Sequence, residues 1–278
     1  MEERSVVDVI EAVPTSDGAG VRLHRSLGTA ALPALDPFLM LDEFRSDNPN
    51  DYIAGFPEHP HRGFETVTYM LAGSVEHKDS LGNTGRLRGG GAQWMTAGRG
   101  VIHSEMPKQE AGLLWGFQLW VNLPAKLKMT APRYQDIEPE RIPEIEHQGA
   151  RVRVVAGSLG GVTGPVSGVS VDPSMFDVRL ASGRSATFEV PPGHASFVYV
   201  YDGVARVGAS ATEVQARHLA VIGKGERLTV RSDDGARFLL LAARPIKEPI
   251  ARSGPFVMNN PAEIKRAFLD YYEGRFAG

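Results

Sequence analysis

Short segments of strand-forming residues, separated by closely spaced glycines and prolines, constrain the fold of this chain most strongly. The sequence has 31 Gly and 19 Pro among its 278 residues, and a typical segment is TVTYML at 66–71, which ends at Ala72-Gly73. Helical periodicity is scarce. Short runs of Val, Tyr, Phe and Thr between turn residues are typical of all-β sandwiches and barrels. We therefore predict an all-β fold.

The stretch from Asn260 is the exception, because it has the pattern of a helix. Asn260 suits the N-cap, Pro261 the first helical position and Glu263 the third. The apolar residues that follow share one helical face: Ile264, Ala267, Phe268 and Tyr271. We predict a short C-terminal helix that packs on the β core.

The length of the chain favours two domains, since single domains usually have roughly 100 to 150 residues. The stretch 131–149, APRYQDIEPERIPEIEHQG, is rich in Pro and acidic residues and nearly free of aromatic ones, as an exposed connector is. We place an N-terminal domain at 1–130, a linker at 131–149 and a C-terminal domain at 150–278, which ends in the helix.

An internal repeat indicates that the two domains are copies of one barrel. Tyr69–Val75 aligns with Tyr199–Ala205, and Gly98–Gly100 aligns with Gly223–Gly225. Each half is therefore expected to contain the same arrangement of strands.

Composition excludes several classes of function. The absence of cysteine excludes disulfides, thiolate catalysis and cysteine-ligated metals, which leaves His and carboxylates as metal ligands. With 30 basic and 33 acidic residues and no run of five Lys/Arg, direct nucleic-acid binding is disfavoured. The sequence has neither a secretory signal pattern nor a stretch that approaches a membrane span, so we expect a cytoplasmic protein without membrane association.

Two short motifs in the first half predict a metal site. In His59-Pro60-His61 and in His103-Ser104-Glu105 the metal-binding side chains are two residues apart, which places each pair on one face of a strand. Glycine-rich turns between the motifs allow the second strand to return opposite the first. Three imidazoles and one carboxylate around an octahedral divalent ion leave two open positions, which suit Fe(II), Mn(II), Ni(II), Co(II), Cu(II) or Zn(II).

The stretch from Gly55 to Pro107, followed by FQLWVNLP at 117–124, resembles the pirin family of the cupin superfamily. This resemblance implies two tandem cupin barrels of the jelly-roll type, with one iron, Fe(II), in the N-terminal barrel. The ligand pattern of the family maps onto four residues here: His59, His61, His103 and Glu105.

Glu65 is a rival for the fourth ligand position. The wider cupin pattern, in which a glutamate follows the HxH motif closely, nominates Glu65, whereas the pirin resemblance implies Glu105 as ligand and Glu65 as a nearby supporting group. Phe56, just before the histidines, is expected at the mouth of the site.

The second barrel is predicted to lack the metal. Alignment of the two halves puts Glu189, Pro191, Leu228 and Val230 at the ligand positions. The remaining histidines have no paired histidine nearby, and we interpret them as isolated turn or surface residues: His24, His77, His147, His194 and His218.

The resemblance implies two alternative functions. The first is a quercetin 2,3-dioxygenase activity, in which the flavonol binds the ion through its 3-hydroxyl, Glu105 accepts the proton, and reaction with O₂ yields a depside and carbon monoxide. The second is a non-catalytic, iron-containing regulator that binds transcription factors or metabolic enzymes, with the oxidation state of the metal changing partner affinity.

Overall fold

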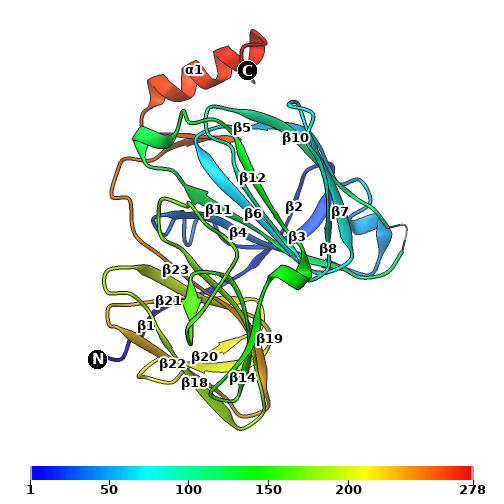
Figure 1. Cartoon of the computed structure of the whole chain (residues 1–278). Helices are drawn as coiled ribbons and strands as arrows, with labels where there is room; N and C mark the ends of the chain where they lie inside the picture. The colour runs from blue at the N-terminus through cyan, green and yellow to red at the C-terminus, as the bar shows by residue number, and fades with distance from the viewer. Residues whose placement is uncertain (1, 110, 277–278) are drawn as a thin grey trace. The chain divides into compact units, whose positions relative to one another are not determined.

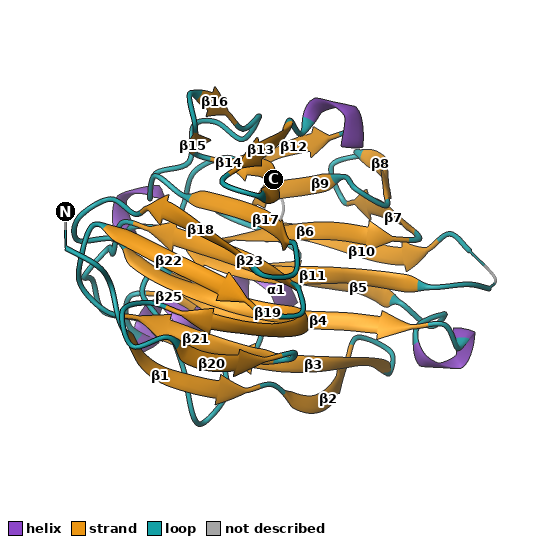
Figure 2. Ribbon diagram, turned by 90° about the horizontal axis from the view of Figure 1, so that it is seen from below, coloured by secondary structure: helices purple, strands orange, loops and turns teal. Residues whose placement is uncertain are grey.

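The computed structural model describes residues 2–109 and 111–276, and these residues are mainly β-strands. Figure 2 shows strands nearly throughout, with little helix. The all-β prediction is therefore confirmed. Two compact units can be distinguished, which we call the first barrel and the second barrel.

The first barrel comprises Pro14–Arg25, Phe38–Pro139 and Ile246–Gly278. One wall is a seven-stranded sheet in the order β12-β9-β6-β11-β4-β3-β2, and the other is a four-stranded sheet in the order β5-β10-β7-β8 (Figure 1). The strands of the larger sheet are β2 (Val13–Asp17), β3 (Val21–Leu27), β4 (Phe38–Ser46), β6 (Phe64–Ala72), β9 (Ala92–Thr96), β11 (Leu114–Asn122) and β12 (Arg133–Ile137). The smaller sheet contains β5 (Phe56–His61), β7 (Ser74–Asp79), β8 (Thr84–Arg88) and β10 (Val101–Pro107). Outside these sheets lie η1 (Pro49–Asp51), η2 (Ala125–Leu127), β24 (Ala251–Ser253), β25 (Phe256–Met258) and α1 (Pro261–Tyr272).

The second barrel comprises Met1–Val13, Ser26–Pro37 and Glu140–Pro245. Its ten-stranded sheet contains β1 (Val6–Glu11), β13 (Glu144–His147), β14 (Ala150–Ala156), β17 (Ser174–Leu180), β18 (Arg184–Glu189), β19 (Ala195–Val207), β20 (Thr212–Gln215), β21 (His218–Ile222), β22 (Arg227–Ser232) and β23 (Ala236–Ala243). A separate hairpin pairs β15 (Ser158–Leu159) with β16 (Val162–Thr163), and η3 (Pro139–Arg141) lies at the start of this region. Its interior is a continuous apolar core that includes Phe176, Phe188 and Phe238.

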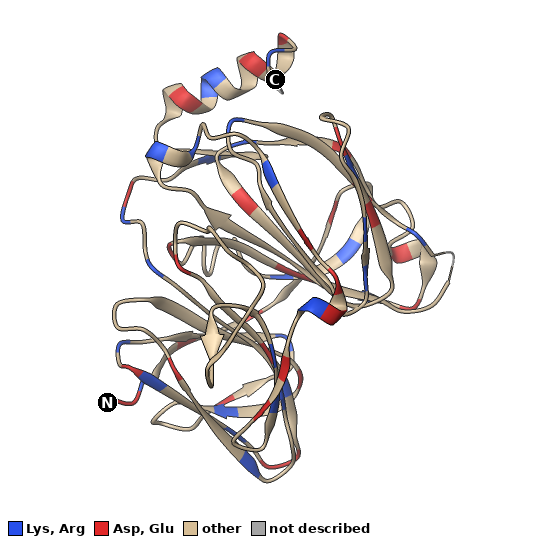
Figure 3. Ribbon diagram, in the orientation of Figure 1, with Lys and Arg blue, Asp and Glu red and all other residues tan. Residues whose placement is uncertain are grey.

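The predicted C-terminal helix is present as α1 and begins with the expected cap. The Asn260 side chain accepts a hydrogen bond from the Glu263 amide at 3.0 Å, and the Glu263 carboxylate accepts one from the Asn259 amide at 2.9 Å. Acidic and basic residues alternate along the length of the helix (Figure 3). Asp270 on the helix pairs with Arg62 at 2.8 Å, so the helix is tied to the residue that follows His61.

A buried lysine also holds the C-terminal segment to the first barrel. The Lys128 ammonium donates to the Gly63 carbonyl at 2.8 Å, to the Asn122 side-chain oxygen at 2.7 Å and to the Val257 carbonyl at 3.0 Å. Burial lowers the pKa of Lys128 to about 8, although the charges of Glu248 and Glu263 oppose this shift.

The compact units differ from the division expected at 1–130, 131–149 and 150–278. The N-terminal strand β1 pairs antiparallel with β21 of the second barrel, and the C-terminal helix belongs to the first barrel. The stretch expected to be a linker contributes β12, which pairs with β9, and β13, which pairs with β14. Terminal and connecting segments complete sheet edges here, because an unpaired edge leaves backbone hydrogen-bonding groups open. Among the described residues, no helix has the length and apolar character needed to cross a membrane.

Candidate metal centre

Two paired strands, β5 and β10, carry the predicted ligands. In their antiparallel register His103 lies opposite His59, and Val101 lies opposite His61. β5 is the edge strand of its sheet, which suits Pro57 and Pro60 because proline has no amide to donate to a neighbouring strand. The register shifts between His103 and Glu105, and such a bulge redirects the side chain that follows it.

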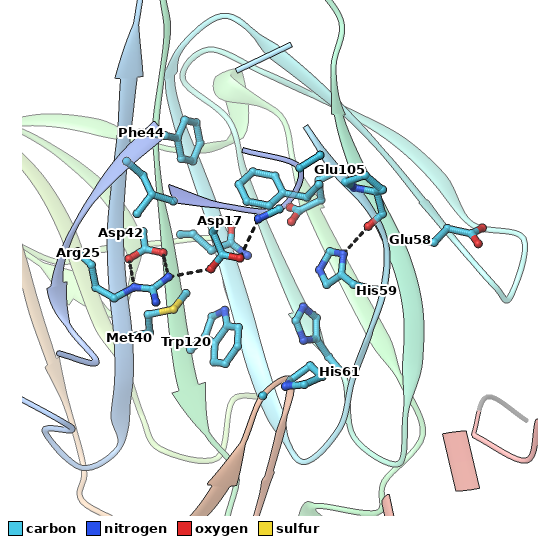
Figure 4. A pocket seen from close by; sticks show the side chains of 18 of the residues that line it. Asp17, Arg25, Met40, Asp42, Phe44, Glu58, His59, His61, Glu105 and Trp120 are labelled. Atoms are coloured by element: carbon cyan, nitrogen blue, oxygen red, sulfur yellow. Dashed lines mark hydrogen bonds and ion pairs between the residues drawn. The ribbon is translucent and has the colours of Figure 1, made fainter. Parts of the chain in front are cut away.

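The three histidine side chains converge. One ring nitrogen from each of His59, His61 and His103 lies within 4.8 Å of the other two. The Nε2 atoms of His59 and His103 are 3.0 Å apart, and the ring centroids of His59 and His61 are separated by 4.6 Å. Figure 4 shows His59 and His61 next to each other at the cavity. This spacing allows all three nitrogens to bind one ion.

Two of these imidazoles are held in the neutral form. Burial, and then the neighbouring histidines, lower the pKa of His61 and of His103 well below the ordinary value of 6.5. Their Nδ1 atoms are buried and have no hydrogen-bond partner among the described residues. A neutral imidazole offers a lone pair to a metal, so the donor set fits a transition-metal ion with nitrogen and oxygen preference.

Glu105 lies at the wall of the same cavity but is not part of this group of three. Its side chain is buried, and its Oε1 accepts a hydrogen bond from the Thr68 hydroxyl at 3.0 Å. Thr68 is itself 2.7 Å from the side-chain oxygen of Gln118. The structure thus brings three of the four predicted ligands together and places the fourth at the cavity beside them.

Glu65 has different surroundings. It lies on β6 in the larger sheet, where the Thr96 hydroxyl donates to its Oε1 at 2.6 Å, and burial raises its pKa. Its side chain does not line the cavity that Glu105 lines. The two glutamates that compete for the fourth ligand position therefore differ in their access to the cavity.

The cavity has a volume of about 620 Å³ and lies between the two sheets of the first barrel, since both contribute to its walls. Phe56, expected at the mouth of the site, is one of the lining residues. A side chain at Gly18 would meet the Phe56 ring at 2.6 Å, so glycine is needed there for this packing. The other apolar lining residues include Leu23, Met40, Phe44 and Trp120.

The wall away from the histidines contains charged groups, as Figure 4 shows for Arg25 and Asp42. Arg25 donates two hydrogen bonds of 2.7 Å to the Asp42 carboxylate and one of 2.9 Å to Asp17. These hydrogen bonds, first those that Arg25 donates to Asp42, raise the pKa of the Arg25 guanidinium. Arg252 lies over the Trp120 ring at 4.6 Å.

The interpretation of His77 as an isolated turn or surface residue is wrong. His77 is buried on β7, directly opposite Glu105 on β10, and its ring lies 6.5 Å from that of His103 and 4.7 Å from that of Tyr134. Alternation along β7 could have indicated that His77 faces the interior. Placing it opposite Glu105 also requires the register of β7 against β10, which the sequence pattern does not give. Arg25 and Arg252 were also missed, since no sequence motif links them to the histidines.

Positions that align with the ligands are packed differently in the second barrel. Leu228 and Val230 are completely buried in its apolar core, whereas Glu189 and Pro191 are exposed. His147 contacts the Thr187 carbonyl at 2.9 Å, and His218 contacts the Ala216 carbonyl at 3.1 Å.

Comparison with known proteins gives consistent matches along the chain. A family model described as Pirin matches residues 20–121, and one described as Pirin C-terminal cupin domain matches residues 175–277. The chain is 49% identical to a pirin-like protein of Caulobacter vibrioides over 99% of this chain and 100% of that protein. It is 42% identical to pirin of Homo sapiens over 92% of this chain and 88% of that protein. A crystal structure of quercetin 2,3-dioxygenase from Acinetobacter baumannii superposes with a TM-score of 0.91 at 34% identity, covering 98% of both chains.

Proposed function

The chain belongs to the pirin family, and from this premise we propose that its first barrel is a metal-dependent oxygenase of the quercetin 2,3-dioxygenase type. One observation carries the proposal. Three imidazoles converge, and two of them, His59 and His61, line a cavity of about 620 Å³, which is within the usual size range of a small-molecule pocket. The 34% identity to a quercetin 2,3-dioxygenase over nearly the whole chain supports the reaction type.

The proposed ligands are His59, His61 and His103, with Glu105 as the fourth. The donor set suits several divalent ions, and we propose Fe(II) among them because of its availability in cells. When bound, the ion would supply a Lewis acid for a substrate hydroxyl and a redox centre for O₂.

The residues of the chain would position the substrate and accept its proton. Glu105 is the proposed base, and the Thr68 hydroxyl at 3.0 Å fixes the orientation of its carboxylate. Phe56 and Trp120 supply apolar surface that excludes water from a planar ring. The substrate class that fits this arrangement is a flavonol or a similar planar phenol.

The test combines elemental analysis of the purified protein with O₂ uptake in the presence of quercetin. We expect metal-dependent uptake, and His59→Ala should abolish both bound metal and activity. Quercetin-dependent uptake that survives complete removal of metal would refute the proposal. Absence of turnover with Fe, Mn, Ni, Co, Cu and Zn, together with a metal-dependent protein partner, would favour the regulator hypothesis instead.

A further inference from the structure

Arg252 lines the cavity as a solvent-exposed residue, and within the described ranges it forms no ion pair with a carboxylate. Its Nη1 donates to the Leu39 carbonyl at 3.2 Å, and its Nη2 lies 3.9 Å from the Met40 sulfur. In the part of the chain that the structure describes, no carboxylate lies within ion-pair distance of Arg252. Partial burial of the guanidinium and then the charge of Arg25 lower the pKa of Arg252, while the charges of Asp42 and Asp17 oppose this shift.

Arg25, the second guanidinium in this cavity, is already neutralised. It binds Asp42 through two hydrogen bonds and Asp17 through a third. The carboxylates that could compete for Arg252 are therefore held by Arg25. Arg252 thus offers the cavity a single guanidinium without an ion pair, which can bind one anionic group of a ligand.

Trp120 connects the histidines with this cation. Its ring lies 5.3 Å from that of His61, nearly perpendicular to it at 74°, and the Arg252 guanidinium lies over the same ring at 4.6 Å. Figure 4 shows Trp120 between His61 and the Arg25–Asp42 pair. A planar ligand that extends from the histidines along Trp120 would bring its far end to Arg252.

We propose that Arg252 selects planar aromatic substrates that carry one anionic oxygen group, a carboxylate or phenolate, at the end away from the histidines. A guanidinium matches the planar geometry of such a group, and stacking on Trp120 holds the guanidinium in place. The inference rests on the proposed function only in treating the histidine end of the cavity as the reacting end.

The test compares 2-naphthoate with 2-naphthamide, which have the same planar ring and differ in charge. Binding of each to the metal-loaded full chain is measured by titration calorimetry. We expect wild type to bind the naphthoate about ten- to a hundredfold more tightly, because hydrogen bonds to charged groups are strong. Arg252→Gln should remove this preference and leave naphthamide binding unchanged, whereas Arg252→Lys should retain part of it.

Arg45 offers a matched control. Its guanidinium lies 4.0 Å over the ring of Trp115 in the same barrel, but neither residue lines this cavity. Arg45→Gln should therefore keep the wild-type preference. Metal content is measured for every variant, so that an effect of metal loss cannot be mistaken for an effect of removing the Arg252 guanidinium.

Two outcomes would overturn the proposal. A preference for naphthoate that persists in Arg252→Gln would mean that the carboxylate binds elsewhere, for example at the metal. Absence of any preference in wild type would refute the proposal even if Arg252→Gln failed to fold. The two proposals are separable: a naphthoate preference without quercetin turnover contradicts only the oxygenase, and turnover without a preference contradicts only the role of Arg252.

Discussion

The interior of the first barrel is hollow and partly polar, whereas the interior of the second barrel is filled with apolar side chains. His103 and Glu105 are buried beside a cavity in the first, while Leu228 and Val230 fill the positions that align with these two residues in the second. Burial of polar groups reduces stability unless they gain partners, and burial of apolar groups increases it. The cupin fold alone therefore does not make a site; the residues on the inward faces of its strands decide between binding and stability.

The largest expected effect is loss of the metal on removal of one imidazole. His61→Ala should lower metal affinity by more than about a hundredfold, since even residues that only support a ligand contribute about ten- to a hundredfold. Elemental analysis of the purified variants measures this. His147→Ala in the second barrel is the control and should retain the metal. If both variants lost the metal equally, the assignment of the metal site to the first barrel would be wrong.

A core substitution in the second barrel should lower stability without changing metal content. Leu228→Ala removes a completely buried side chain and should lower the free energy of unfolding by about 2 to 5 kcal/mol. Metal content should not change, because the residue belongs to the core without the histidines. Denaturant unfolding and elemental analysis on the same sample measure both quantities. Loss of metal from the folded variant would contradict the proposed division of roles.

The next largest effect is a difference in metal binding between variants of Glu105 and Glu65. Glu105→Gln should weaken metal binding by about ten- to a hundredfold, because Glu105 lines the cavity. Glu65→Gln should have little effect on the metal, since Glu65 bonds Thr96 within the larger sheet. Metal titration of both variants decides between them. Loss of metal in Glu65→Gln alone would reverse the assignment of the fourth ligand.

The smallest effect is a pH dependence that arises from Lys128. Its pKa in the folded protein, about 8, lies below its ordinary value of 10.5, so the unfolded chain binds more protons between these values. The contribution of Lys128 to stability is therefore present above pH 10.5 and is lost as the pH falls through 8, by at most about 1.4 kcal/mol per pH unit. The difference in unfolding free energy between wild type and Lys128→Met, followed from pH 7 to 10, should show this slope. A constant difference would contradict it.

Local patterns made the fold class and three converging histidines predictable. Alternation along a strand places His59 and His61 on one face, and the cap at Asn260 defines the start of α1. Contacts that depend on strand register were not predictable. The pairing of β7 with β10 puts His77 opposite Glu105, and no local period encodes that pairing.

Segments distant in the chain also escaped prediction. The ion pair between Arg25 and Asp42 joins neighbouring strands, and Arg252 enters the cavity from the C-terminal segment. Sequence patterns can indicate that each of these residues is charged, but not that they meet in one wall. The part of the candidate site that concerns metal binding was therefore easier to predict than the part that concerns substrate selection.

The ion pair between Arg62 and Asp270 has a consequence for synthesis of the protein. Arg62 follows His61 directly, while Asp270 is near the end of the chain, and both side chains are largely buried. A ribosome completes the three histidine positions more than a hundred residues before it adds the helix that pairs with Arg62. The first barrel therefore lacks its C-terminal helix until most of the second barrel has been synthesised.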